Sequence, residues 1–139
     1  MPAKNPGRGQ RGFSVSVLVC LLIPILLVCI GLAVDGAAKA AADRRAEAVA
    51  AQAARAGLDA AAPALVSGMT SEAGAGQIAV RAAEQVIASH PDMEGMAVVG
   101  GEVTLQVTTS TTVRTTFLSL AGIDELPGRG SAIVELRMR

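Results

Sequence analysis

The fold of this chain is decided by residues 13–34, FSVSVLVCLLIPILLVCIGLAV. The stretch has no charged side chain, and its only hydroxyl side chains are those of Ser14 and Ser16. As a helix rising about 1.5 Å per residue, it would be roughly 33 Å long, enough to cross a hydrocarbon core of about 30 Å. The sequence therefore predicts a transmembrane helix near the N-terminus.

A secretory signal peptide is the main alternative to a retained anchor. The apolar region of a signal peptide usually has about 7–15 residues and ends at a small-residue cleavage site. The run here is longer, although the small residues at 37–42 leave later cleavage open. Pro24 lies in the middle of the run, and membrane helices tolerate proline there. We expect the helix to be retained.

The distribution of charge predicts how the anchor is oriented. Lys4, Arg8 and Arg11 precede the apolar run, whereas all twelve acidic residues follow it together with nine basic residues. Basic flanks stay in the cytoplasm. We therefore expect a single-pass protein of the cell membrane, with its N-terminus in the cytoplasm and its C-terminal domain outside it.

Composition limits what lies beyond the anchor. A chain of 139 residues leaves space for one small domain after the span. That part has no tryptophan or tyrosine and few large apolar side chains, so packing against a partner would help to stabilise it. It is slightly acidic and has no basic patch, which gives no support to nucleic-acid binding.

The alanine-rich residues 35–62 predict that the anchor continues outside the membrane as a helical stalk. A stripe of small residues follows the spacing of one helix face, and we take it as a candidate packing seam: Ala46, Val49, Ala50, Ala53 and Gly57. Two occupants of this seam remain open. One is the chain's own C-terminal domain, and the other is a copy of the chain or a partner stalk.

The remaining residues, 63–139, predict a small α+β domain. Glycines and Pro63 indicate a loop at 63–76, and residues 77–89 indicate a helix with one apolar side formed by Ile78, Ala82, Val86 and Ile87. Three or four antiparallel strands follow. The chain thus divides into a cytoplasmic leader (1–12), the span (13–34), the stalk (35–62) and this domain (63–139).

The strands are indicated by alternation of apolar and polar residues. Residues 96–99 and 102–108 would form a hairpin about Gly100-Gly101, with Val103, Leu105 and Val107 on the buried face. We expect another strand at 111–115, a short helical turn at 117–122, a loop at 127–130, and a last strand over 132–138.

No pattern typical of an enzyme is found. The chain has one histidine, His90, no glycine-rich phosphate loop and no cluster of metal-ligand residues. Cys20 and Cys29 both lie in the span, and a separation of nine residues puts them on opposite helix faces. We expect no catalytic site, no metal and no cofactor.

Four segments resemble the TadE/TadG-like proteins of the tight-adherence (Flp-type, type IVb) pilus system: residues 11–14, RGFS; 31–36, GLAVDG; 45–57, RAEAVAAQAARAG; and 115–123, TTFLSLAGI. The resemblance implies a minor, pilin-like component of a pilus and secretion machine. It also implies a candidate prepilin-type cleavage between Gly12 and Phe13. Pilin-like subunits usually carry a glutamate at the fifth residue after that cut, where this chain has Val17.

The leading hypothesis is therefore a membrane-anchored accessory protein of pilus assembly or secretion. Its partners would be the membrane and other pilin-like or pilus-assembly proteins, reached through helix–helix packing. The alternative is a membrane-tethered module that binds an extracellular ligand, with the threonines at 108–112 as its candidate contact surface.

Overall fold

The computed structural model describes residues 10–68, 70–100 and 104–136, and for residues 10–14 it describes the backbone only. The elements follow one another as helix α1 (Gln10–Ser67), helix α2 (Glu72–Ala88), strands β1 (Glu94–Gly100) and β2 (Thr104–Arg114), a short 3-10 helix η1 (Leu118–Ala121) and strand β3 (Glu125–Glu135). The α+β class expected from the sequence is confirmed. Gly100 of the expected turn ends β1, whereas Gly101, Val103 and most of the leader lie outside the described residues.

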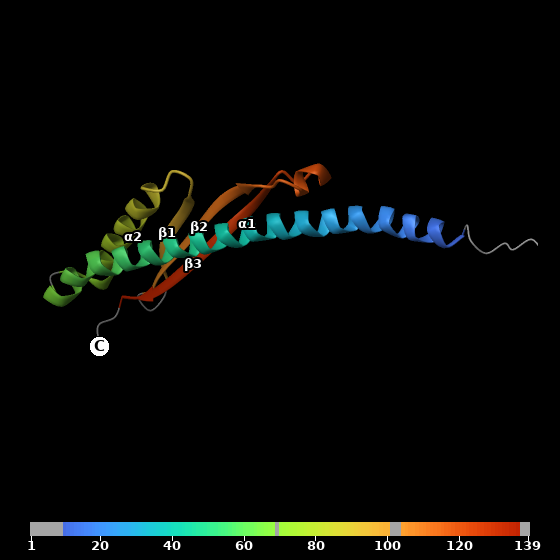
Figure 1. Ribbon diagram of the computed structural model, residues 1–139. Coiled ribbons are helices and arrows are strands. Elements are labelled where there is room, and N and C mark those ends of the chain that lie inside the picture. The colour runs from blue at the N-terminus through green and yellow to red at the C-terminus, as the bar shows by residue number, and fades with distance from the viewer. Residues whose placement is uncertain (1–9, 69, 101–103, 137–139) are drawn as a thin grey trace, which may run out of the picture.

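The architecture is a long helix with a small head on its C-terminal half (Figure 1). The sheet is antiparallel with β2 in the centre, and α1 and α2 pack together on one of its faces. Along β2 the residues that face the helices, Leu105 and Val107, are buried, and Gln106 between them is exposed, as the alternation predicted.

The core joins the sheet to both helices. It is formed mainly by alanines of α1 and α2, with Ile87, Leu105, Val107 and Leu136 as its larger members. Alanine brings the helix backbones close to each other and to the sheet. The large apolar residues are few, so the core is built from close approach and not from bulky side chains.

Helix α1 extends past Pro63 to Ser67, beyond the expected end of the stalk. Proline removes one backbone hydrogen bond from a helix. Here Ala61 is buried in the core, and Ala64 and Leu65 pack against it, so tertiary contacts hold the last turns in place. The expected loop from residue 63 is therefore wrong in its first part.

Helix α2 begins at Glu72, five residues before the expected start, because Ser71 caps it by accepting a hydrogen bond from the Gly74 amide at 3.2 Å. Its buried face also differs from the expected one. That face consists of Ala75, Gly76, Ala79, Ala83 and Ile87. Ile78, which the sequence pattern placed on the apolar side, is exposed.

Strand β2 is one continuous strand where two were expected, and β3 begins earlier than expected. Residues 127–130 were expected to form a loop but lie within β3, paired with residues 109–112 of β2. Pro127 is tolerated because the opposite edge of β3 has no strand partner in the described sheet. The expected helical turn at 117–122 is confirmed as η1, closed by Gly122 at φ 84°.

Candidate functional site

The junction between the apolar half of α1 and the head is organised by one carboxylate, that of Asp35. Its oxygens accept hydrogen bonds from three successive backbone amides, those of Thr116 at 2.8 Å, Phe117 at 2.9 Å and Leu118 at 2.6 Å. The residue is only 2% exposed. A buried carboxylate is costly unless its lone pairs are satisfied, and here they are.

The three amides open the turn that leads into η1, so Asp35 of α1 acts as a cap supplied by a distant part of the chain. The Thr116 amide is the largest cause that lowers the pKa of Asp35, and the Leu118 and Phe117 amides act in the same direction. Burial acts in the opposite direction but does not prevail. The carboxylate is therefore charged at neutral pH and fixes the loop to the helix.

One helical turn earlier, Gly31 lets the same loop lie directly against α1. A Cβ atom on Gly31 would be 2.5 Å from Cγ of Phe117, too close for two carbon atoms. Gly31 and Asp35 are four residues apart and so lie on one helix face. Together they bind the 116–118 turn at the end of the apolar run.

A second set of contacts holds β3 and β2 against the next turns of α1. Asp43 accepts hydrogen bonds from Lys39 Nζ at 2.8 Å and from the Arg129 amide at 3.0 Å. Thr109, buried in β2, donates its hydroxyl to the Ala46 carbonyl at 2.8 Å. The Lys39 hydrogen bond is the largest cause that lowers the pKa of Asp43, followed by the Arg129 amide.

Two glycines in β3 allow the backbone of this strand to lie close to the backbone of α1. A Cβ atom on Gly130 would be 2.2 Å from the Glu47 nitrogen, and one on Gly128 would be 2.6 Å from Cβ of Ala42. The strand backbone therefore lies directly on the helix backbone. This close fit explains why the sequence has glycine at these positions inside a strand.

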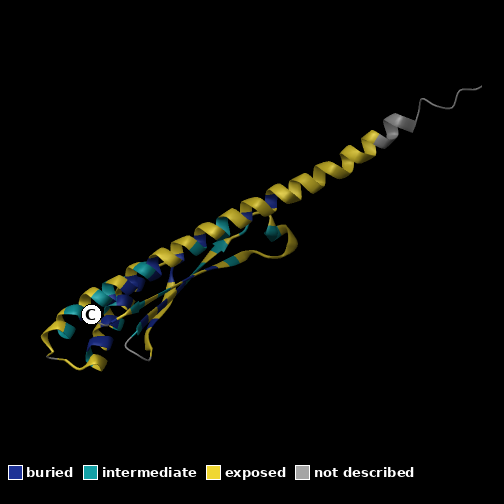
Figure 2. Cartoon of the chain, turned by 90° about the horizontal axis from the view of Figure 1, so that it is seen from below, coloured by how far each residue is buried: buried dark blue, intermediate teal, exposed yellow. Residues whose placement is uncertain are grey.

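The candidate packing seam lies wholly in this interior. All five of its residues, Ala46, Val49, Ala50, Ala53 and Gly57, are buried. In the structure they face the chain's own sheet and α2, the first of the two occupants that the sequence left open. The buried face also begins earlier than the seam, at Gly31 and Asp35 (Figure 2).

Gly12 and Phe13 lie in the first turns of α1. Nothing in the described structure tests a cut between them, and processing there stays a prediction. Sequence reasoning did not predict the role of Asp35, which it treated as one of the acids after the span and as part of the 31–36 segment of the family resemblance. The available signal was an acid placed four residues after Gly31 at the end of an apolar run.

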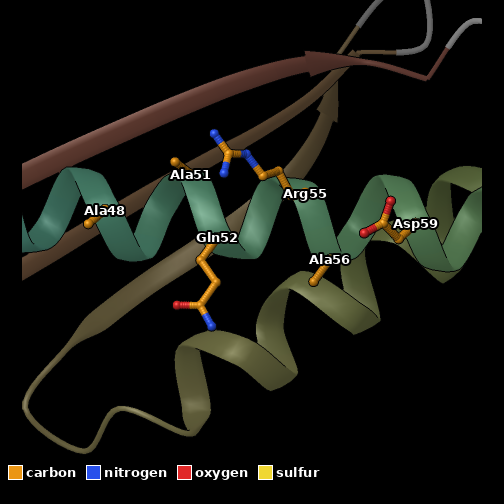
Figure 3. A pocket seen from close by; sticks show the side chains of 6 residues that line it. All are labelled: Ala48, Ala51, Gln52, Arg55, Ala56 and Asp59. Atoms are coloured by element: carbon orange, nitrogen blue, oxygen red, sulfur yellow. The ribbon is translucent and has the colours of Figure 1, made fainter.

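Open depressions occur on the surface of the head. One, of about 520 Å³, runs along α1 and is lined by Ala48, Ala51, Gln52, Arg55, Ala56 and Asp59. Figure 3 shows Gln52 and Ala56 on the side of α2, with Arg55 and Asp59 directed away from it. No group of three or more residues suited to a metal ion occurs among the described residues.

Within the described part of the chain, α1 is the helix long and apolar enough to cross a membrane. No curated protein and no solved structure matches the chain. Residues 12–70 match the model of the family described as "Putative Flp pilus-assembly TadE/G-like". The match covers the apolar run, Asp35 and the helical half that carries the head. Over these residues the resemblance drawn from the sequence is confirmed: this part of the chain is similar to the TadE/G-like family of Flp pilus assembly.

Proposed function

We propose that this protein is an accessory component of Flp-type pilus assembly or secretion, anchored in the membrane by residues 13–34, and that it acts by helix–helix packing with other pilin-like subunits. One observation carries the proposal. Large apolar side chains of α1 from Val15 to Ile30 are exposed, whereas from Gly31 onward one face of the helix is covered by the head. The exposed half needs lipid or other apolar helices around it.

The head covers part of the surface of α1 and so limits where a partner helix can pack. It covers the seam from Ala46 to Gly57, so those residues serve the chain's own fold. The helix surfaces that remain open are the apolar half and, on the outer half, the side lined by Ala48 and Ala51 (Figure 3). We assign contacts with pilin-like subunits to these surfaces.

The orientation follows from charge. Basic residues 4, 8 and 11 precede the span and no acid does, which favours a cytoplasmic N-terminus. The proposed division is then a leader (1–12), a span (13–34), a stalk (35–62) and an exported domain (63–139). Removal of the leader between Gly12 and Phe13 belongs to the same proposal.

Part of the candidate surface of the ligand-binding alternative is used by the fold itself. The threonines at 108–112 lie in β2, the central strand of the sheet. Thr109 is buried and bonded to Ala46, and the Thr111 hydroxyl donates to the Asp92 carbonyl at 2.8 Å. Thr109 and Thr111 therefore support the fold, whereas Thr108 and Thr112 are exposed, and no observation points to a ligand for them.

The test is photo-crosslinking in cells that assemble the pilus. A photoreactive amino acid replaces Val28, which is 68% exposed on the apolar half, and in a matched control it replaces Ile133, which is 66% exposed on the sheet. We expect position 28 to give adducts with pilin-like subunits, identified by mass spectrometry, that position 133 does not give. Lipid adducts alone at position 28 would refute helix packing in the membrane.

The orientation has a separate test. Alkaline phosphatase fused to the C-terminus is active only outside the cytoplasm. We expect an active fusion, and an inactive one, with the fusion intact on a blot, would reverse the proposed topology.

A further inference from the structure

The loop that Asp35 holds lies at the level of the membrane span. The Phe117 ring packs on Gly31, which belongs to the apolar run, three residues before its end at Val34. At the rise of a helix this contact is about 4.5 Å inside the end of the run. Figures 1 and 2 both show η1 and its flanking turns beside this part of α1.

The outward surface of this loop is apolar. Leu120 is 88% exposed, Ile123 is 46% exposed and Phe117 is 39% exposed. The loop from residue 117 to residue 123 contains no charged residue. Apolar side chains at the end of the span, such as Leu32 and Val34, are exposed near the same level of α1.

The backbone of the loop is also suited to an apolar surrounding. Irregular backbone at membrane depth is tolerated only where its polar groups are satisfied internally. Here the amides of residues 116–118 donate to Asp35, and three later amides bond within the loop: Leu120 to the Phe117 carbonyl, Gly122 to the Ser119 carbonyl and Ile123 to the Leu118 carbonyl, at 3.0–3.1 Å. The Ser119 hydroxyl donates to the Thr116 carbonyl at 2.9 Å.

The charges around the loop limit its depth. Asp35 lies on the inner side, between loop and helix, and is shielded from the surroundings. The exposed Asp124 and Glu125 follow the loop immediately, and the ion pair of Lys39 with Asp43 follows one turn along α1. Charged residues thus border the turn after Ile123 and along α1.

From these observations we infer that residues 117–123 insert into the outer interface of the lipid bilayer and form a second membrane contact of the head beside the anchor. Leu120 is the residue that enters furthest, with Phe117 and Ile123 on either side of it. The occupant of this surface is lipid, because the loop packs on Gly31 and so lies beside the outer end of the span, at its depth. The inference rests on the proposed membrane anchor.

The absence of tryptophan from the chain allows a direct test. Three single-tryptophan proteins, each the full chain in lipid vesicles, are compared: Leu120→Trp in the loop, Ile30→Trp in the span and Ile133→Trp on the outer face of the sheet. All three positions are exposed, so the fold accepts the larger side chain. Quenching is measured with phospholipids brominated near the headgroup and with iodide in the water.

We expect the Leu120→Trp emission to be shifted to the blue and quenched by brominated lipid about as strongly as that of Ile30→Trp. Ile133→Trp should be quenched by iodide and not by the lipid. Quenching of Leu120→Trp by iodide alone, while Ile30→Trp responds to lipid, would overturn the loop insertion and leave the anchor standing. Shielding of Leu120→Trp from both quenchers would also overturn it, since protein would then cover the surface. Failure of Ile30→Trp to respond to lipid would refute the anchor itself.

Discussion

Replacing Gly130 by alanine should separate the sheet from α1. The added Cβ atom would be 2.2 Å from the Glu47 nitrogen and 2.3 Å from the Ala46 carbonyl carbon, both of them backbone atoms that no side-chain rotation can move. To restore ordinary contact, the strand must retreat by about 1 Å. Overpacking of this kind costs about 1–3 kcal/mol.

The retreat has a second cost, in the hydrogen bond from the Thr109 hydroxyl to the Ala46 carbonyl. Thr109 pairs with Gly130 across the β2–β3 ladder, so it moves with the strand, and its 2.8 Å bond lengthens. A buried hydroxyl without its partner costs about 1–3 kcal/mol. Because the two effects share one movement, we expect a total of about 2–4 kcal/mol, a large part of the ~5–15 kcal/mol typical of a folded protein.

Hydrogen exchange of the full chain in lipid nanodiscs measures this loss. Amides of β3 and of the α1 turns beneath it should exchange at least about thirtyfold faster in Gly130→Ala, because 1.4 kcal/mol corresponds to tenfold. Gly36→Ala is the control, since its Cβ atom would meet nothing within 4 Å and alanine is the better helix former by about 1 kcal/mol. Unchanged protection of β3 in Gly130→Ala would show that the strand is not seated on α1.

Three further predictions address other parts of the molecule. The pKa of Asp35 is lowered in the folded state, so its contribution to stability is present above the ordinary aspartate pKa of about 3.9 and is lost as the pH falls through the folded value. The Asp35→Asn variant should therefore melt at a lower temperature than the unaltered protein at neutral pH and should lack this loss of stability in acid. An unchanged melting temperature at neutral pH would contradict the role of the carboxylate. The double variant Ala50→Leu, Ala53→Leu should destabilise the head by more than about 2 kcal/mol, because both side chains are fully buried in the core. An unchanged melting temperature together with reduced co-purification of pilin-like proteins would instead place a partner on the seam. Mass spectrometry of the membrane protein should find Phe13 at the mature N-terminus, and a Gly12→Leu variant should retain its leader; an intact leader on the unaltered protein would refute processing.

The sequence was sufficient for features that depend on local pattern. The apolar run is recognised by its length and lack of charge. The alternation along β2 and the end of β3 follows the period of a strand, and the turn at 117–122 is closed by a glycine with positive φ. These signals do not depend on what lies opposite in the fold. The order of helices and strands could be predicted for the same reason.

Features that depend on close approach between distant elements could not be predicted. Gly74, Gly76, Gly128 and Gly130 indicated loops, because glycine usually does. In the structure, however, Gly76 leaves space for Val99, and Gly128 and Gly130 leave space for α1. Asp35 was similarly hidden, because its partners are backbone amides more than 80 residues away, and amides have no signature in the sequence.

The contacts at Gly31 and Asp35 bear directly on how the protein would act in a pilus machine. Because α1 continues without a break from the apolar run into the head, no linker separates anchor from head. The loop whose amides are bonded to Asp35 adds a second connection between head and helix at the end of the apolar run. Any tilt of the anchor therefore also tilts the sheet. A partner helix that packs on the apolar half would therefore set the direction in which the head points. Under the proposed function, helix packing in the membrane would position the head through the continuous helix α1, and loss of the Asp35 hydrogen bonds should free only the 116–118 turn while anchor and head stay joined.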